Sequence, residues 1–269
     1  MMGKKKFWLS DMGDKFRKAQ HGQPEPEAFF GYRRIPEHEK TRWVLRHFNS
    51  VAKQYDFMNT LLSFGIHHIW KREAVNRMGL RSGDRVIDVC GGTGDLALLA
   101  ARKVGTRGAV TIYDINRAMI AAGRDKIARS KMGRRITAVE GNAEELSFPD
   151  NCFDAAMVGY GIRNVTHMEK GFEEMYRVLK PRGKLMCLEF SKPTDRWFRY
   201  LYDFYSFHIM PLLGELMAGS RNAYTHLPES IRTFPMPDEL SDILSRIGFN
   251  HVNFRRQTNG ISVIHLGVK

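Results

Sequence analysis

The chain has 269 residues, which fits one large α/β domain with short additions. Its 42 lysines and arginines against 29 acidic residues give a net charge of +13, which favours an anionic partner such as a nucleic acid or an acidic lipid surface, although a merely soluble basic protein would carry the same excess. Three cysteines without a C-x-x-C pair argue against secretion and against a zinc site, and no apolar run approaches the ~18 residues that span a bilayer.

Residues 1–40 are basic and then rich in proline and glutamate, and we expect a flexible arm. Its first part also fits a short amphipathic helix on an anionic membrane, with Phe7, Trp8, Met12 and Phe16 on one side. No long apolar segment follows the first lysines, so we expect a cytoplasmic protein that is neither exported nor transmembrane.

Residues 41–80 show helical spacing of apolar side chains and predict N-terminal helices. Residues 81–193 then alternate strands and helices, with the strands "RVIDVC", "AVTIYDI", "RITAVEG", "FDAAMVGY" and "KLMCLEF". Residues 238–269 predict a final helix and two strands around Asn259-Gly260, a dipeptide typical of hairpins. The expected fold is α/β and Rossmann-like, with a mostly parallel seven-stranded sheet, helices on both faces and a C-terminal antiparallel hairpin.

The turn "CGGTGD" after the first of these strands is a cofactor-binding signal, with Gly91, Gly92 and Gly94 allowing close backbone approach. The G-x-G-x-x-A pattern fits a nicotinamide dinucleotide, but Asp95 would then face a pyrophosphate. S-adenosylmethionine has no phosphate and carries positive charge, so Asp88 and Asp95 suit its methionine end. The pattern therefore favours S-adenosylmethionine.

Polar residues after the next two strands extend this site. Asp114 lies about 20 residues beyond the turn, the spacing of a carboxylate that bonds ribose hydroxyls. Asn142 offers an amide to the adenine edge, while the small side chain of Ala143 leaves room beside the purine. Each aspartate alone would also fit a helix cap or a surface charge, but three at successive strand ends favour a binding site.

The motifs "VIDVCGGTGD", "GNAEELSFPDNCFD", "GYGIRNVT", "LEFSKP" and "YTHLPESIRTFP" resemble the ubiquinone/menaquinone biosynthesis C-methyltransferases from about Val44 to the C-terminus. The resemblance implies a class I methyltransferase in which Thr93, Asp114, Asn142 and Ala143 contact S-adenosylmethionine. It implies a polyprenylated quinol substrate, with demethylmenaquinol favoured and a methoxy-polyprenyl-benzoquinol as the alternative. The chain departs from the family at Gly159, where serine or threonine is usual, at Arg182, where "LKPGG" is usual, and in its long arm.

The quinol ring must lose a hydroxyl proton to become a carbon nucleophile, which requires a base or a water path and a positive group. Arg163 and Asn164 follow the fourth strand, where substrates bind in such sheets. We assign Arg163 to stabilising the phenolate and orienting a water, and Asn164 to holding that water. Tyr55 is a candidate for closing the site and relaying the proton, or a core aromatic.

The aromatic segment 194–237 lies where class I methyltransferases carry a substrate-side insertion, so it is either a packed helix or the lining of an isoprenoid channel. Such a substrate implies peripheral attachment to the anionic inner face of the cytoplasmic membrane; a homodimer or a quinone-biosynthesis complex stays open. We expect no metal and no nucleic-acid partner. The competing functions are a methyltransferase for nucleic acid or another small molecule and a non-catalytic cofactor-binding protein.

Overall fold

The computed structural model describes residues 25–218 and 221–269, and its centre is a seven-stranded sheet in the order β5-β4-β3-β6-β7-β9-β8. All neighbouring strands are parallel except β9, which runs antiparallel to both β7 and β8. This arrangement confirms the predicted fold, including the C-terminal hairpin. The strands are β3 (Arg85–Val89), β4 (Ala109–Asp114), β5 (Ile136–Glu140), β6 (Phe153–Gly159), β7 (Leu179–Phe190), β8 (Asn250–Gln257) and β9 (Ser262–Val268).

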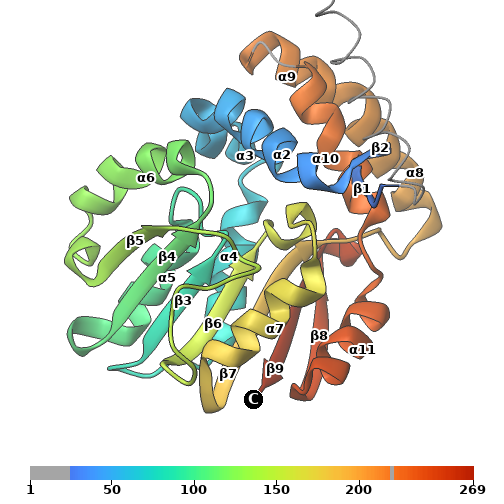
Figure 1. Ribbon diagram of the computed structural model, residues 1–269. Coiled ribbons are helices and arrows are strands. Elements are labelled where there is room, and N and C mark those ends of the chain that lie inside the picture. Colours follow the sequence, from blue (N-terminus) through green and yellow to red (C-terminus); the bar gives the residue numbers. More distant parts are fainter. Residues whose placement is uncertain (1–24, 219–220) are drawn as a thin grey trace, which may run out of the picture.

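Helices cover both faces of the sheet because its central strands are apolar on both sides (Figure 1). Val86 and Met157 belong to a core cluster with α4 (Ile66–Arg77) and α5 (Asp95–Val104). Ile87 and Val158, one residue along each strand, belong to the opposite cluster with α7 and α11, as the strand period of two requires. The remaining helices of these layers are α6 (Arg117–Arg129), α7 (Met168–Val178) and α11 (Pro237–Ile247).

A third group of helices forms a cover over one end of the sheet, where Figure 1 shows α2, α3, α9 and α10 together. A separate apolar cluster joins residues 51–62 to Met210 and Tyr224, so the N-terminal helices and the late insertion pack as one unit. The cover comprises α2 (Glu37–Val51), α3 (Tyr55–Leu62), α8 (Arg196–Phe204), a π-helix (Tyr205–Ile209), α9 (Met210–Ala218) and α10 (Arg221–Thr233).

The C-terminal part of the predicted flexible arm is structured instead. β1 (Glu27–Phe30) and β2 (Arg33–Pro36) form an antiparallel hairpin, and α2 begins directly after it, earlier than the expected boundary at residue 41. The Phe30 ring stacks on the His226 ring of α10 with centroids 3.8 Å apart. This contact offsets part of the conformational entropy lost when the hairpin becomes ordered. The amphipathic helix considered for the first residues lies outside the described part.

No helix within residues 25–218 and 221–269 is long and apolar enough to cross a membrane.

Candidate active site

The glycine turn lies between β3 and α5, as predicted, and its backbone requires glycine. Gly94 has φ +82°, and a Cβ there would lie 2.8 Å from the Ile112 side chain. A Cβ on Gly91 would lie 2.9 Å from the Asp88 carboxyl carbon. The turn can therefore pack closely against β3 and β4, and it lines a cavity of about 110 Å³, here called the cofactor cavity.

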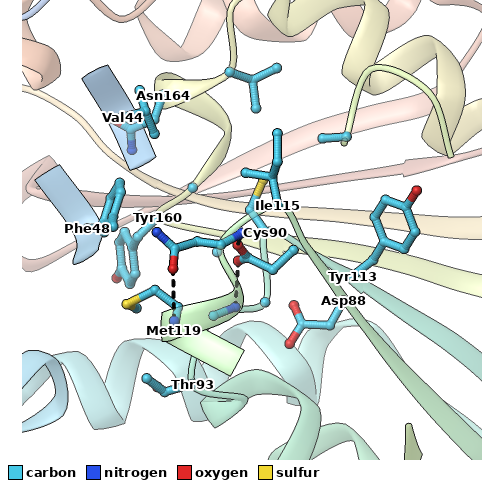
Figure 2. A pocket seen from close by; sticks show the side chains of 18 of the residues that line it. Val44, Phe48, Asp88, Cys90, Thr93, Tyr113, Ile115, Met119, Tyr160 and Asn164 are labelled. Carbon is cyan, nitrogen blue, oxygen red and sulfur yellow. Dashed lines mark hydrogen bonds between the residues drawn. The ribbon is translucent and has the colours of Figure 1, made fainter. Parts of the chain in front are cut away.

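Asp88 is a buried carboxylate that faces the cofactor cavity (Figure 2). Neither of its oxygens has a side-chain hydrogen-bond partner in the described part of the chain, and the backbone N–H of Ala97 is the polar group that most favours its charged form. Burial raises the pKa of Asp88 to about 8, because the charged form is poorly solvated there. An ammonium group bound in the cavity would supply the missing partner, so the residue fits the methionine end of S-adenosylmethionine.

Asp114 and the turn after β5 occupy another side of the same cavity. Asp114 accepts backbone N–H bonds from Gly92 and Asn116, each 2.8 Å long, and burial raises the pKa of its carboxyl. Asn142 is exposed and Ala143 is buried, and both line the cavity. The structure thus brings together the residues that the sequence predicted for ribose and adenine.

Asp95 lines the cavity but does not present an uncompensated charge to it. Its carboxylate pairs with Lys71 at 2.7 Å and also with Lys126. Burial alone would raise the pKa of Asp95, but these two ammonium groups hold it well below its usual range. Lys126 also pairs with Asp56 at 2.6 Å, and Asp56 accepts the Thr93 hydroxyl at 2.6 Å. These four charged residues, 56, 71, 95 and 126, form a cluster that ties the cover to the glycine turn.

A second cavity of about 500 Å³, the apolar cavity, adjoins the cofactor cavity. Its walls come from the cover, from the π-helix and from the ends of β6 and β7. The two cavities share four lining residues, which mark their junction: Phe48, Tyr55, Lys71 and Tyr160. Figure 2 shows Phe48 and Tyr160 on the side of the cofactor cavity away from Asp88 and Tyr113. Tyr55 therefore lies between the two cavities. A residue that closes the site or relays the quinol proton would have to lie there.

Arg163 lines the apolar cavity, but a neighbouring carboxylate neutralises it. Its guanidinium donates to Glu189 at 2.8 Å and to the backbone oxygen of Tyr160, and it lies over the Phe190 ring at 5.4 Å. Arg163 and Glu189 are both buried, and burial raises the pKa of Glu189 while Arg163 opposes that shift. The guanidinium predicted to stabilise the phenolate is thus part of a buried ion pair.

Asn164, the neighbour of Arg163 in sequence, faces the cofactor cavity instead. Its Oδ1 accepts from the His226 ring at 3.2 Å, and its buried Nδ2 has no partner in the described residues. His226 and His47 line the apolar cavity with rings 4.9 Å apart. Burial lowers the pKa of His226 to about 2 and that of His47 to about 4, so both are neutral at pH 7.

Three side chains of a kind that can bind a metal each place one possible ligand atom within 4.8 Å of the other two: His67, His68 and Asp95. Both Asp95 oxygens are engaged by lysine ammonium groups, which would compete with a metal cation. Burial lowers the pKa of His67 to about 3, with Lys71 adding to the effect. This cationic surrounding does not favour a metal site.

The departure from the family at Gly159 has a local packing reason. A Cβ on Gly159 would lie 2.4 Å from Leu96 Cδ1, so a serine or threonine here would require Leu96 to move. The position lines the cofactor cavity from β6. Leu96 therefore fills the space at the cavity wall that a side chain on residue 159 would need.

Sequence reasoning missed the partners of the predicted residues. Glu189 could have been noticed as the one acidic residue in the apolar strand "KLMCLEF". Lys71, Lys126 and Asp56 come from three different helices, and nothing in their local sequence marks them as neighbours. His226 belongs to "YTHLPESIRTFP", a motif that indicates the family without indicating a role for its histidine.

Comparison with known proteins adds a family and a fold. Residues 36–269 match the ubiE/COQ5 methyltransferase family. A Pseudomonas putida (strain GB-1) protein, "Ubiquinone/menaquinone biosynthesis C-methyltransferase UbiE", is 44% identical over 253 residues, covering 94% of this chain and 98% of that relative. The Stutzerimonas stutzeri protein of the same name is 44% identical over 245 residues, covering 91% and 96%.

Two solved structures share the fold at low identity. The [4+2]-cyclase SpnF has a TM-score of 0.60 at 17% identity, covering 84% of this chain and 95% of that one. A SAM-dependent methyltransferase from Aquifex aeolicus has a TM-score of 0.54 at 17% identity, covering 74% and 88%. At such identity the likeness extends to the fold alone.

Proposed function

The chain belongs to the ubiE/COQ5 methyltransferase family, and on that premise we propose that it methylates a ring carbon of a polyprenylated quinol, with demethylmenaquinol as the preferred substrate. The observation that carries the substrate class is the apolar cavity of about 500 Å³ that adjoins the cofactor cavity. A naphthoquinol ring presents fewer polar groups to such walls than a methoxylated benzoquinol, which favours the menaquinone precursor.

S-adenosylmethionine supplies the methyl group in activated form, as a sulfonium substituent. The unpartnered oxygens of Asp88 suit its ammonium group, and Asp114 and Asn142 line the cavity where its ribose and adenine would lie. The protein's part is to align the ring carbon with the methyl group and exclude water. The four residues at the junction, 48, 55, 71 and 160, surround the place where the two must meet.

Positive charge at the junction would stabilise the quinol phenolate. We assign this to Lys71, which lines both cavities, and to Arg163, which lines the apolar cavity. Asp95 and Glu189 hold the two cations in position, so little reorganisation is needed as negative charge forms on the substrate oxygen. Arg163 thus keeps the role of stabilising the phenolate, and Lys71 is added to it.

A proton must leave the quinol hydroxyl, and Arg163 is too basic to accept it. His47 and His226 are neutral and line the cavity that would hold the ring. His226 uses Nε2 toward Asn164, and its buried Nδ1 has no partner in the described residues. Because burial holds the pKa of both imidazoles far below 7, they are weak proton acceptors, and we propose that the proton leaves through a water path, with Tyr55 closing the site above the ring.

The substrate's isoprenoid tail would keep it in a lipid bilayer, so the protein must work at a membrane surface. The net charge of +13 supports attachment to an anionic leaflet. We place the protein peripherally on the inner face of the cytoplasmic membrane, alone, as a homodimer or within a quinone-biosynthesis complex.

The test is a competition assay with S-adenosylmethionine and equal amounts of chemically reduced short-tail demethylmenaquinol and methoxy-polyprenyl-benzoquinol, followed by mass spectrometry. Preferential methylation of the naphthoquinol is expected. Preference for the benzoquinol would overturn the ring assignment. If the cofactor binds and neither quinol gains a methyl group, the protein binds S-adenosylmethionine without this activity.

A further inference from the structure

Large apolar side chains surround the apolar cavity and remain exposed to solvent. Phe64, Leu201 and Phe204 line the cavity, yet they are 77%, 66% and 57% exposed. They come from the α3–α4 connection and from α8, which are far apart in sequence. An apolar wall that continues onto the surface indicates that the cavity has an apolar mouth.

Two aromatic residues on α8 extend this mouth without lining either cavity. Trp197 is 81% exposed and Tyr200 is 61% exposed, and their rings lie 6.4 Å apart. Ile209 of the π-helix, also exposed, lines the cavity. These six residues, here called the rim, are Phe64, Trp197, Tyr200, Leu201, Phe204 and Ile209. Tryptophan and tyrosine are the side chains that favour a membrane–water interface.

The charges on α8 suit an anionic lipid surface. Arg196 and Arg199 are exposed beside Trp197. Asp195, the N-cap, accepts the Phe198 backbone N–H at 2.8 Å, and Asp203 pairs with Arg232 of α10. Asp203 is thus ion-paired within the protein and Asp195 is bonded to the start of the helix, while Arg199 donates only to the uncharged backbone oxygen of Pro193. Positive charge therefore remains next to the apolar rim.

We propose that the rim inserts into the acyl region of a lipid bilayer, so that the isoprenoid tail enters the apolar cavity directly from the membrane. This inference rests on the proposed quinol substrate. A second copy of the chain bound to the rim would block the mouth through which the isoprenoid tail must enter. A lipid bilayer would instead leave the mouth open to the acyl region in which the tail resides. The rim therefore differs from a purely electrostatic anchor, whose binding disappears in salt.

The first test measures sedimentation of the full chain with phosphatidylcholine vesicles containing phosphatidylglycerol, in about 1 M salt, where the Debye length is about 3 Å. Trp197→Ser/Tyr200→Ser should weaken binding roughly tenfold or more, since the variant removes two large side chains that the lipid would bury. Phe29→Ser, a half-exposed residue on the N-terminal hairpin outside both cavities, is the matched control and should bind like wild type.

The second test uses brominated lipids, which quench a tryptophan only at short range. Wild-type fluorescence should be quenched, whereas Trp197→Phe should bind vesicles normally and lose most of that quenching. Unchanged quenching would mean that another tryptophan enters the lipid and would overturn the proposal, as would wild-type binding by the double variant. A double variant that changes oligomeric state in light scattering and still binds vesicles would assign the rim to a second copy.

Neither readout needs turnover. If the quinols are not methylated but Trp197 is quenched, the membrane surface stands and the substrate assignment fails. Two results together would support both proposals. Wild type and Trp197→Ser/Tyr200→Ser should methylate a tailless quinol equally, and only wild type should act on the long-tailed quinol in vesicles.

Discussion

Asp88 is the residue whose environment most clearly depends on a ligand. With a pKa of about 8 in the folded protein against about 3.9 unfolded, it binds its proton more tightly when folded. The free protein should therefore lose stability as pH rises from about 4 to about 8. Asp88→Asn should remove this loss, raising the unfolding temperature of the free protein at pH 8, and should weaken S-adenosylmethionine binding about tenfold or more.

Calorimetry in buffers of different ionisation enthalpy checks the same assignment. Cofactor binding at pH 7 should release a proton as Asp88 ionises against the ammonium group, and Asp88→Asn should release less. A variant with unchanged affinity and unchanged proton release would remove Asp88 from the binding site.

The Arg163–Glu189 pair separates stability from catalysis. Arg163→Ala leaves a buried carboxylate unpaired and should cost about 3–5 kcal/mol of stability. Arg163→Met/Glu189→Met removes both charges and should restore most of that stability, measured by denaturant unfolding. Turnover should stay sharply reduced in both variants while cofactor affinity is spared. Recovery of turnover in the double variant would show that Arg163 only neutralises Glu189.

At the scale of elements, Asp56 connects the cover to the glycine turn. It lies on α3 and contacts both Thr93 in the turn and Lys126 on α6. Asp56→Asn should loosen this contact and weaken cofactor binding several-fold, with a stability loss of about 1 kcal/mol or less because the pair is partly exposed. Glu73→Gln, which breaks a surface pair within α4, is the control and should leave cofactor binding unchanged.

Arg182 in the bend within β7 is a strained residue at a position where the family usually has glycine. Its φ is +66°, which is costly for a side chain with a Cβ. Arg182→Gly should raise the free energy of unfolding by about 0.5–1 kcal/mol. The substitution relieves the backbone strain, but part of that gain is lost because glycine has more conformational freedom in the unfolded chain. Arg182→Ala keeps the Cβ and should give no such gain in chemical denaturation; an equal gain would show that the side chain, and not φ, is responsible.

The alternation of strands and helices in residues 81–193 could be predicted because each strand is a short apolar run bounded by turn residues. The hairpin β1–β2 could not, since its order depends on the contact of Phe30 with His226, almost two hundred residues away. For the aromatic segment 194–237 the sequence left two interpretations open, a packed helix and the lining of an isoprenoid channel. The structure combines them, because Phe198 packs against the core and also lines the apolar cavity.

On the scale of the whole molecule, the sheet and the cover make different contributions to the site. The carboxyl ends of β3, β4 and β5 carry the cofactor residues that motifs reveal, because these residues are close in sequence to their strands. The cover supplies most walls of the apolar cavity and Asp56, the partner of Thr93. Lys71 of α4 and Lys126 of α6 pair with Asp95, and only tertiary packing brings all of these groups together. A sequence therefore predicts the cofactor more fully than it predicts the substrate.

In the mechanism proposed above, the quinol ring carbon becomes nucleophilic when a ring hydroxyl loses its proton, and that carbon then receives the methyl group. The most direct measurement supplies S-adenosylmethionine with a labelled methyl group together with demethylmenaquinol, either chemically reduced or left as the oxidised quinone, and locates the label by mass spectrometry and NMR. We expect label on a ring carbon of the reduced substrate and none on the quinone, which has no hydroxyl proton to lose. Label on oxygen, or equal labelling of the oxidised ring, would contradict it.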